Sequence, residues 1–150
     1  MNKETAKTPS DEADLRSFLS ETFVVYMKTY ALHWNYEGPK FYGIHKLTET
    51  QYTDIATAID EVAERIRAIG QPAPVSLSQI LENSSLKEFR NAQFNDQAIK
   101  DLAQSHRKLS QLAKRVAKKA EEEKDLFTHD LMVARSGAHD KFAWLLESVF

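Results

Sequence analysis

Helix-breaking residues are scarce in this chain. It has only four Gly and four Pro among 150 residues, and seven of these eight lie in three places. Pro9 stands near the N-terminus, a second group surrounds Gly38 and Pro39, and a third spans 70–74. The stretches between these groups are too long for β-strands, which usually contain about 3–10 residues. The sequence therefore predicts an all-α protein.

The composition is typical of one soluble globular domain. Hydrophobic residues make up 42% and charged residues 28% of the chain, and the net charge is −2. The chain has no Cys, which excludes thiol catalysis, Cys-ligated metal sites and a disulfide-built scaffold. The first residues contain no apolar signal segment, and no run approaches about 18 apolar residues. We therefore expect a cytoplasmic protein without a membrane span.

Apolar residues at spacings of three or four predict four long helices. They are expected to begin near Asp11, within 41–44, near Asn95 and near Asp125. Residues 1–10 are predicted to form a flexible tail, with Ser10 as the N-cap of the first helix, and residues 11–150 to form one domain. A few residues around Gly38 join the first two helices, so these should form an antiparallel hairpin.

A long connection separates the two halves of the chain. It spans roughly 71–94, and Ser76 followed by LSQILE predicts a short capped helix inside it. Two helical hairpins joined by one long crossover are typical of the ferritin-like four-helix bundle.

The apolar stripes predict which residues form the core. On the first and second helices they are Leu15, Leu19, Phe23, Tyr26, Tyr30 and His33, and Tyr52, Ile55, Ile59, Val62, Ile66 and Ile69. On the third helix they are Ile99, Leu102, Leu109, Leu112, Val116 and Ala120. On the fourth helix they are Leu131, Ala134, Ala138, Phe142, Leu145 and Val149.

Two histidines near the first hairpin are candidate metal ligands. His33 lies on the apolar stripe, where a single His is most often a core residue with a satisfied hydrogen bond. However, His33 lies five residues before Gly38 and His45 lies six residues after Pro39. The two imidazoles are therefore expected at similar heights on adjacent helices.

Two acidic pairs continue this pattern on the second helix. Glu49 lies four residues after His45, and Glu64 lies four residues after Asp60. Such a carboxylate pair is usually part of a solvated face, where like charges repel each other. These carboxylates, however, lie beside the isoleucine stripe. Other charged residues occupy the opposite face: Asp54, Glu61 and Arg65.

The length of the second helix decides how a metal site could form. His45 and Asp60 are about 22 Å apart along the helix axis, so one straight helix cannot bring them together. Two copies packed antiparallel about an axis near Asp54 or Ile55 would place the imidazoles of one copy opposite the carboxylates of the other, twice per dimer. This mixture of nitrogen and oxygen ligands suits iron, manganese or zinc. The Glu-x-x-His motifs of single-chain di-iron bundles do not occur in the sequence.

Three runs carry a resemblance to a known family. They are His33-Trp34-Asn35, FYGIHKLTET and AIDEVAERIRAIGQPAP, and the similarity extends over nearly the whole chain to the closing HDKFAWLLES. The chain resembles the Dps mini-ferritins of the ferritin-like superfamily. The resemblance implies a dodecameric shell with iron sites at its dimer interfaces. It also implies oxidation of Fe(II), preferably by hydrogen peroxide, storage of the Fe(III) mineral and protection against oxidative stress.

The resemblance also implies which residues bind iron. By matching position, His33, His45 and Glu49 would come from one subunit, and Asp60 and Glu64 from its neighbour. Many members have Asp where this chain has Glu49, so the longer side chain is expected to alter the second metal position.

Further roles follow from position and resemblance. Trp34 neighbours the site and could donate an electron that limits radical escape, or it could simply pack at the helix end. Glu121, Asp125 and Asp130 would line a pore through which iron enters the shell; alternatively, they complement the positive end of a helix dipole. The remaining histidines have no partner at metal-ligand spacing and are expected to be structural or solvated: His106, His129 and His139.

DNA binding has weaker support in the sequence. The tail has Lys3 and Lys7 against Glu4, and twelve copies of a −2 chain sum to about −24. The third helix carries a basic set that is also typical of a solvated face: Arg107, Lys108, Lys114, Arg115, Lys118 and Lys119. Two alternatives to iron oxidation therefore remain, a DNA-compacting shell without enzymatic activity and a structural dimer that holds zinc. Association with the nucleoid would depend on DNA binding.

Overall fold

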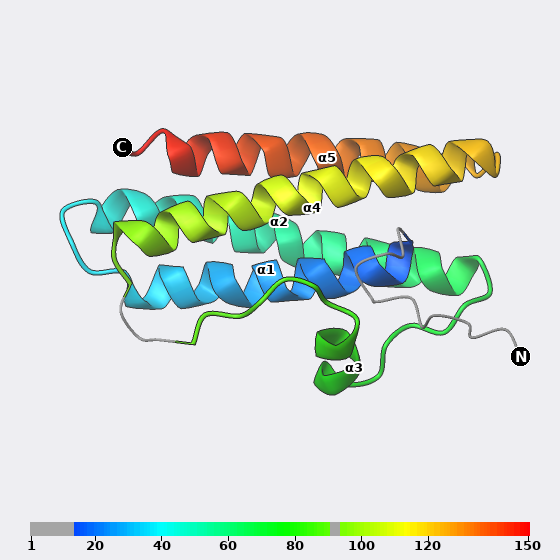
Figure 1. Cartoon of the computed structure of the whole chain (residues 1–150), viewed down its shortest axis with the longest axis horizontal. Coiled ribbons are helices and arrows are strands. Elements are labelled where there is room, and N and C mark those ends of the chain that lie inside the picture. The colour runs from blue at the N-terminus through cyan, green and yellow to red at the C-terminus, as the bar shows by residue number, and fades with distance from the viewer. Residues whose placement is uncertain (1–13, 91–93) are drawn as a thin grey trace, which may run out of the picture.

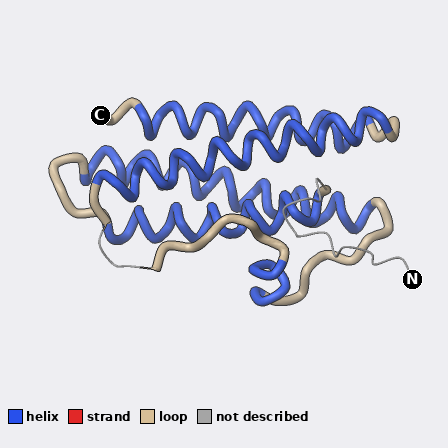
Figure 2. The backbone as a smooth tube through the Cα atoms, viewed as in Figure 1, coloured by secondary structure: helices blue, strands red, loops and turns tan. Residues whose placement is uncertain are grey.

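The computed structural model describes residues 14–90 and 94–150, and within these ranges it contains helices and no strands (Figure 2). This confirms the predicted all-α class. The helices are α1 (Leu15–Asn35), α2 (Phe41–Ala68), α3 (Leu77–Glu82), α4 (Asp96–Glu122) and α5 (Leu126–Glu147).

The four long helices form a bundle of two hairpins (Figure 1). Helix α1 packs on α2 and α4 packs on α5, while α1 also contacts α4 and α2 contacts α5. The long crossover between the hairpins runs along α1, and its short helix α3 contacts α1 (Figure 1). This confirms the ferritin-like bundle with a short helix in the crossover.

Side-chain caps set three of the predicted helix starts. The side chain of Ser76 accepts a hydrogen bond from the backbone at the start of α3, and Asn95 and Asp125 do the same for α4 and α5. Each cap satisfies a backbone N–H that has no partner within its helix. The turn between α4 and α5 contains Lys124 at a φ of 61°, so this boundary is formed without Gly or Pro.

The start of α1 differs from the sequence prediction. The Asp14 side chain accepts a hydrogen bond from the Ser17 backbone N–H at 2.8 Å, and the Ser17 hydroxyl accepts one from the Asp14 N–H at 3.2 Å. This reciprocal capping box begins the helix at Leu15 instead of near Asp11. Ser10 and the predicted tail lie outside the described residues.

The core confirms the predicted face of α4 and corrects that of α5. All six residues predicted for α4 are buried. On α5, however, Ala134 is exposed, and several other predicted residues are only partly buried. The buried face instead contains polar side chains, which an apolar pattern does not detect. It consists of Thr128, Met132, Arg135, Ser136, His139, Phe142, Ala143 and Leu146.

One flank of α2 contacts α5. The Arg135 guanidinium contacts the Asp54 carboxylate at 2.8 Å, and Arg65 contacts Asp125 at 2.7 Å. The candidate carboxylates themselves, Asp60 and Glu64, are exposed on the isolated chain. The ion pairs therefore orient α2 so that its other edge faces away from the bundle. In the part of the chain that the structure describes, no helix is long and apolar enough to span a membrane.

Candidate metal centre

The two candidate histidines are held by reciprocal hydrogen bonds between α1 and α2. The Nδ1 atom of His33 lies 2.9 Å from the backbone oxygen of His45, and Nδ1 of His45 lies 3.1 Å from the backbone oxygen of His33. Their rings stack with centroids 3.8 Å apart. The structure thus brings the two imidazoles together at the hairpin end, as predicted from their positions.

These hydrogen bonds determine where the imidazole protons lie. A backbone carbonyl can only accept a hydrogen bond, so each Nδ1 must carry the hydrogen. In the neutral ring, each Nε2 then has a free lone pair, the form that binds a metal ion. Burial lowers the pKa of His33, and the hydrogen bond to His45 opposes only part of that effect. The neutral ligand form of His33 is therefore favoured near pH 7.

Thr48 supports this arrangement from behind the His33 ring. Its hydroxyl donates to the Ile44 backbone oxygen at 2.6 Å and lies 3.1 Å from Nδ1 of His33, from which it can accept. The Thr48 side chain is fully buried. Groups of this kind behind a ligand fix the ring orientation and raise the affinity of the site for metal.

We predict that Thr48→Val weakens Fe(II) binding about tenfold, because one hydrogen bond to the ligand is lost while the side-chain volume is retained. Anaerobic calorimetric titration measures this affinity. The matched control is Thr50→Val, since the Thr50 hydroxyl is exposed and bonds only to the Lys46 backbone oxygen at 3.3 Å. Equal affinities for the two variants would contradict a supporting role of Thr48.

Glu49 lies on the same helix as His45, but a lysine holds its carboxylate. The Lys46 ammonium contacts Oε2 of Glu49 at 3.1 Å. The hydrogen bond and charge of Lys46 lower the pKa of Glu49. Glu49 is therefore ionised near pH 7, and Lys46 competes with a metal ion for one of its two carboxylate oxygens.

The other two candidate ligands do not join this cluster within one chain. Asp60 and Glu64 lie farther along α2, and no group of three His, Asp or Glu residues among the described residues is arranged to hold a metal. Asp60 borders a groove between α2 and the crossover that is lined by Leu19, Phe23, Ile59, Val75, Leu77 and Ile80. Val75 and Leu77 are 85% and 72% exposed, so this apolar surface adjoins the carboxylate end of α2.

Trp34 lies at the surface beside the two histidines. Its side chain is 60% exposed, and its ring centroid lies 4.9 Å from that of Tyr30. Tyr30 in turn stacks on Tyr52 of α2 at 4.2 Å. Trp34 therefore packs on the Tyr30 ring at the end of α1. Tyr30 in turn connects it to Tyr52 beside the candidate site.

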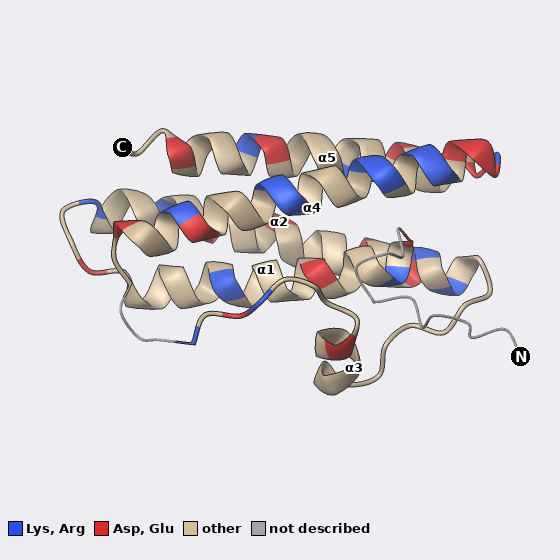
Figure 3. Cartoon of the chain, in the orientation of Figure 1, with Lys and Arg blue, Asp and Glu red and all other residues tan. Residues whose placement is uncertain are grey.

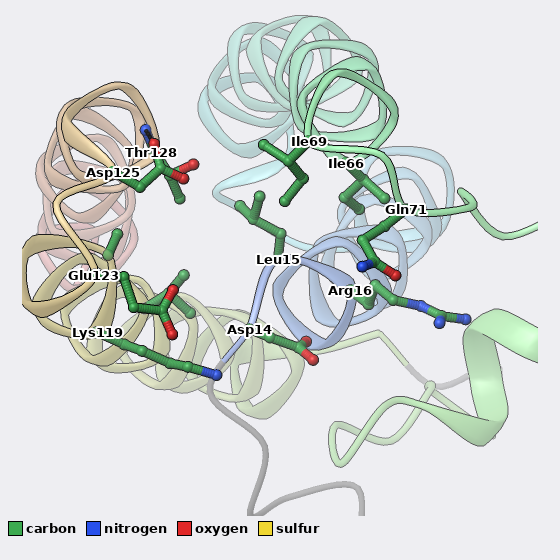
Figure 4. A pocket seen from close by; sticks show the side chains of 12 residues that line it. Asp14, Leu15, Arg16, Ile66, Ile69, Gln71, Lys119, Glu123, Asp125 and Thr128 are labelled. Atoms are coloured by element: carbon green, nitrogen blue, oxygen red, sulfur yellow. Dashed lines mark hydrogen bonds between the residues drawn. The ribbon is translucent and has the colours of Figure 1, made fainter.

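The predicted pore residues lie at the end of the bundle where α4 meets α5. Asp125 borders a pocket formed by the ends of four helices (Figure 4). Burial raises the pKa of Asp125, but hydrogen bonds from Thr128 and the Arg65 guanidinium outweigh this effect and lower it. The Asp125 carboxylate is thus already engaged. Glu121 is exposed, and the Asp130 side chain is 86% exposed.

A buried histidine pair lies inside the bundle and was not predicted from the sequence. His106 of α4 and His139 of α5 are fully buried, with their Nδ1 atoms 3.0 Å apart. This agrees with the structural role predicted for His106 and His139, but the hydrogen bond between them was not predicted. Their separation of 33 residues conceals the contact, which arises only when α4 and α5 pack together. His129, in contrast, lies beside Asp130 at the surface.

Comparisons with known proteins agree with this fold. The family model of the ferritin-like domain matches residues 12–150. The DNA protection during starvation protein of Helicobacter pylori is 30% identical over 135 residues, which cover 89% of this chain and 94% of that protein. This chain belongs to the Dps family of ferritin-like proteins.

Solved Dps structures share the whole bundle. Dps from Staphylococcus aureus has a TM-score of 0.85 and 27% identity, covering 90% of this chain and 91% of that one. Dps from Vibrio cholerae, described as a member of a broad superfamily of ferritin-like diiron-carboxylate proteins, has a TM-score of 0.84 and 29% identity. The match covers 89% of this chain and 84% of the Vibrio chain.

Proposed function

We propose that this protein is a ferroxidase that uses hydrogen peroxide in preference to oxygen. It stores the resulting Fe(III) mineral in a dodecameric cage built from two-fold dimers. Membership of the Dps family supports a general role in iron storage and DNA protection. The Vibrio relative's diiron-carboxylate class supports chemistry with iron in particular.

The main observation in support of this proposal is that each chain holds two separate halves of a candidate metal site, which we call half-sites. Two imidazoles, each bonded through Nδ1 to a backbone oxygen, lie at one end of the α1–α2 hairpin, while two exposed carboxylates lie farther along α2. A second copy that packs antiparallel on the exposed face of α2 would bring its carboxylates to these imidazoles. The exposed apolar surface beside Asp60 supports such a partner, because exposed patches of this kind mark interfaces.

Each proposed ligand has a role in this site. His33 and His45 of one subunit would bind Fe(II) together with Asp60 and Glu64 of the other. Nitrogen and oxygen ligands also accommodate manganese or zinc, so these ions would compete with iron as substrate. Glu49 would bind a second ion in competition with Lys46, which contacts one of its carboxylate oxygens.

The charge arrangement favours a particular route for iron. Acidic residues gather at the turn between α4 and α5 (Figure 3). Of the three predicted pore residues, Glu121 and Asp130 are the better candidates to attract Fe(II), since Arg65 engages Asp125. Trp34 would supply an electron near the site.

The DNA-compacting alternative has less support from the same surface. Lys and Arg lie along α4 (Figure 3), but two of them are paired with acids of α5. Arg107 contacts Glu147 at 2.7 Å and Lys114 contacts Asp140 at 2.9 Å. These pairs reduce the positive charge available to phosphates. Lys3 and Lys7 lie outside the described residues.

The double variant Asp60→Ala, Glu64→Ala tests the proposal. Wild-type protein mixed with Fe(II) and hydrogen peroxide should develop ferric absorbance, and we predict that the variant loses at least about a hundredfold in rate because half of each site is absent. The control is Asp54→Asn, which changes an acid on the same helix that faces Arg135. Unchanged oxidation in the double variant would contradict the proposed function.

Native mass spectrometry separates the remaining alternatives. The proposed cage requires a dodecamer, whereas a structural dimer holding zinc would remain a dimer and purify with that metal. A gel shift that weakens with salt, together with unchanged DNA binding in Asp60→Ala, would instead favour the DNA-compacting shell.

A further inference from the structure

Four redox-capable aromatic side chains form a continuous stack beside the candidate metal centre. Tyr52 meets His33 edge to face at 5.1 Å and stacks on Tyr30 at 4.2 Å with an interplanar angle of 15°. Tyr30 contacts Trp34 at 4.9 Å and Tyr26 at 4.9 Å. Every step from the ligand His33 to the surface Trp34 is therefore a contact between two rings.

The stack bridges two helices at a defined point. Tyr26, Tyr30 and Trp34 follow one another at spacings of four on α1, so they line one side of that helix, and Tyr52 joins them from α2. The three tyrosines are partly buried, whereas Trp34 is exposed. An electron vacancy that forms on Tyr52 would therefore pass to partly buried rings before it reaches the surface.

A hydrogen bond distinguishes Tyr30 within the stack. The Tyr26 hydroxyl donates to the Tyr30 hydroxyl oxygen at 3.4 Å. This hydrogen bond, followed by burial, raises the pKa of Tyr26 to about 12. Tyr26 therefore keeps its proton, and its hydrogen bond remains available to the Tyr30 oxygen after Tyr30 has lost a proton and an electron. Tyr30 is the best-stabilised position for a radical in this stack.

The chemistry of the proposed substrates creates a need for such a group. Hydrogen peroxide must accept two electrons to become two molecules of water, and a single Fe(II) supplies one. Glu49, the candidate ligand of a second ion, is paired with Lys46, so a site that has bound a single Fe(II) must take the other electron from elsewhere. The chain has no Cys that could provide the missing electron. A phenol beside a ligand can provide it, because tyrosine and tryptophan are side chains that lose single electrons readily.

We propose that Tyr52 and Tyr30 relay the second electron of peroxide reduction to a site that holds one Fe(II). The inference rests on the function proposed above. In the first step, Fe(II), hydrogen peroxide, one tyrosine and one proton give Fe(III), a tyrosyl radical and two water molecules. In the second step, another Fe(II) and a proton reduce the radical to tyrosine and leave a second Fe(III). The O–O bond breaks in the first step, and no hydroxyl radical is released.

The first test uses rapid freezing and electron paramagnetic resonance after one Fe(II) per site is mixed with hydrogen peroxide. Wild-type protein should show a tyrosyl radical that disappears when more Fe(II) is added. Tyr52→Phe should lose that signal, whereas Tyr30→Phe should confine the radical to Tyr52 and lower the oxidation of Trp34, which peptide mass spectrometry detects, because it removes the tyrosine that links Tyr52 to Trp34. The matched control is Tyr42→Phe, because Tyr42 is exposed on the same hairpin and has no ring contact among the described residues. A radical of wild-type intensity in both Tyr30→Phe and Tyr52→Phe would overturn the relay.

The second test needs no iron and therefore separates the relay from the proposed function. A photo-oxidant in solution removes an electron from exposed Trp34, and transient absorption follows the radical. In wild-type protein the tryptophan radical should give way to a tyrosyl radical, whereas in Tyr30→Phe it should persist. Transfer to tyrosine without iron oxidation would show that the aromatic side chains conduct an electron but would overturn the ferroxidase that the relay serves. Iron oxidation with no transfer to tyrosine in either test would overturn the relay and support the ferroxidase.

Discussion

Two inactive variants should restore activity when they share a dimer. One variant carries His33→Ala and His45→Ala, and the other carries Asp60→Ala and Glu64→Ala. If each site takes its imidazoles from one subunit and its carboxylates from the other, a mixed dimer contains one intact site and one doubly defective site. Random pairing makes about half of the dimers mixed, so about a quarter of all sites should recover.

Co-expression with two different affinity tags and purification over both columns provides the mixed assemblies. The measurement is the rate of ferric absorbance per subunit, and each variant alone is the control. Mixing the finished shells without subunit exchange should restore nothing. If the co-expressed assemblies remained as inactive as their parents, the site would lie within one chain, contrary to the half-site geometry.

Acid should destabilise the bundle well above the pH at which carboxylates titrate. Burial lowers the pKa of His106 to about 3 and lowers that of His139 well below its usual value, and nearby Arg135 adds to both effects. In the unfolded chain, both residues titrate near pH ~6.5. Below that pH the unfolded chain binds more protons than the folded chain. The free energy of unfolding should therefore fall by up to about 1.4 kcal/mol per pH unit for each His.

Urea unfolding midpoints between pH 7.5 and 5 measure this effect while the carboxylates remain ionised. The double variant His106→Leu, His139→Leu should lose most of the pH dependence, whatever its stability at pH 7.5. His129→Gln is the matched control and should keep the wild-type slope, since His129 lies at the surface beside Asp130. A double variant with the full wild-type slope would show that other groups cause the acid sensitivity.

The hydrogen bonds of the His106–His139 pair also explain why neither ring accepts a further proton. Arg135 donates to Nε2 of His139 at 3.3 Å, so His139 carries its hydrogen on Nδ1 and donates it to Nδ1 of His106. His106 must then carry its own hydrogen on Nε2, which has no partner among the described residues. A further proton on either ring would place a positive charge beside Arg135 in the core, which is costly without a counter-charge.

Much of the fold was open to prediction because it depends on local patterns. The clusters around Gly38 and Gly70 end the first two helices, and Ser76, Asn95 and Asp125 mark the starts of α3, α4 and α5 through side-chain caps. The first helix was misplaced because the decisive cap, Asp14 with Ser17, was one of several candidate caps in that stretch. Local sequence does not show which of these residues caps the helix, and the packing of the helix decides it.

The candidate site likewise has features that local sequence predicts and features that it does not. The positions of His33 and His45 on either side of a tight turn already brought them together, since helix geometry fixes their heights. The proton positions on these rings, the Lys46–Glu49 pair and the tyrosine stack depend on contacts across the hairpin, which spacing does not reveal.

The helices, the two hairpins and the nearness of His33 to His45 follow from local sequence, because periodicity, caps and turn residues act over short distances. That polar Arg135 and His139 occupy the core face of α5 follows from packing, since their burial depends on partners from α2 and α4. The same holds for the aromatic stack, in which Tyr52 and Tyr30 meet only once α1 and α2 have packed. Contacts between residues distant in the chain are set by the docking of whole helices.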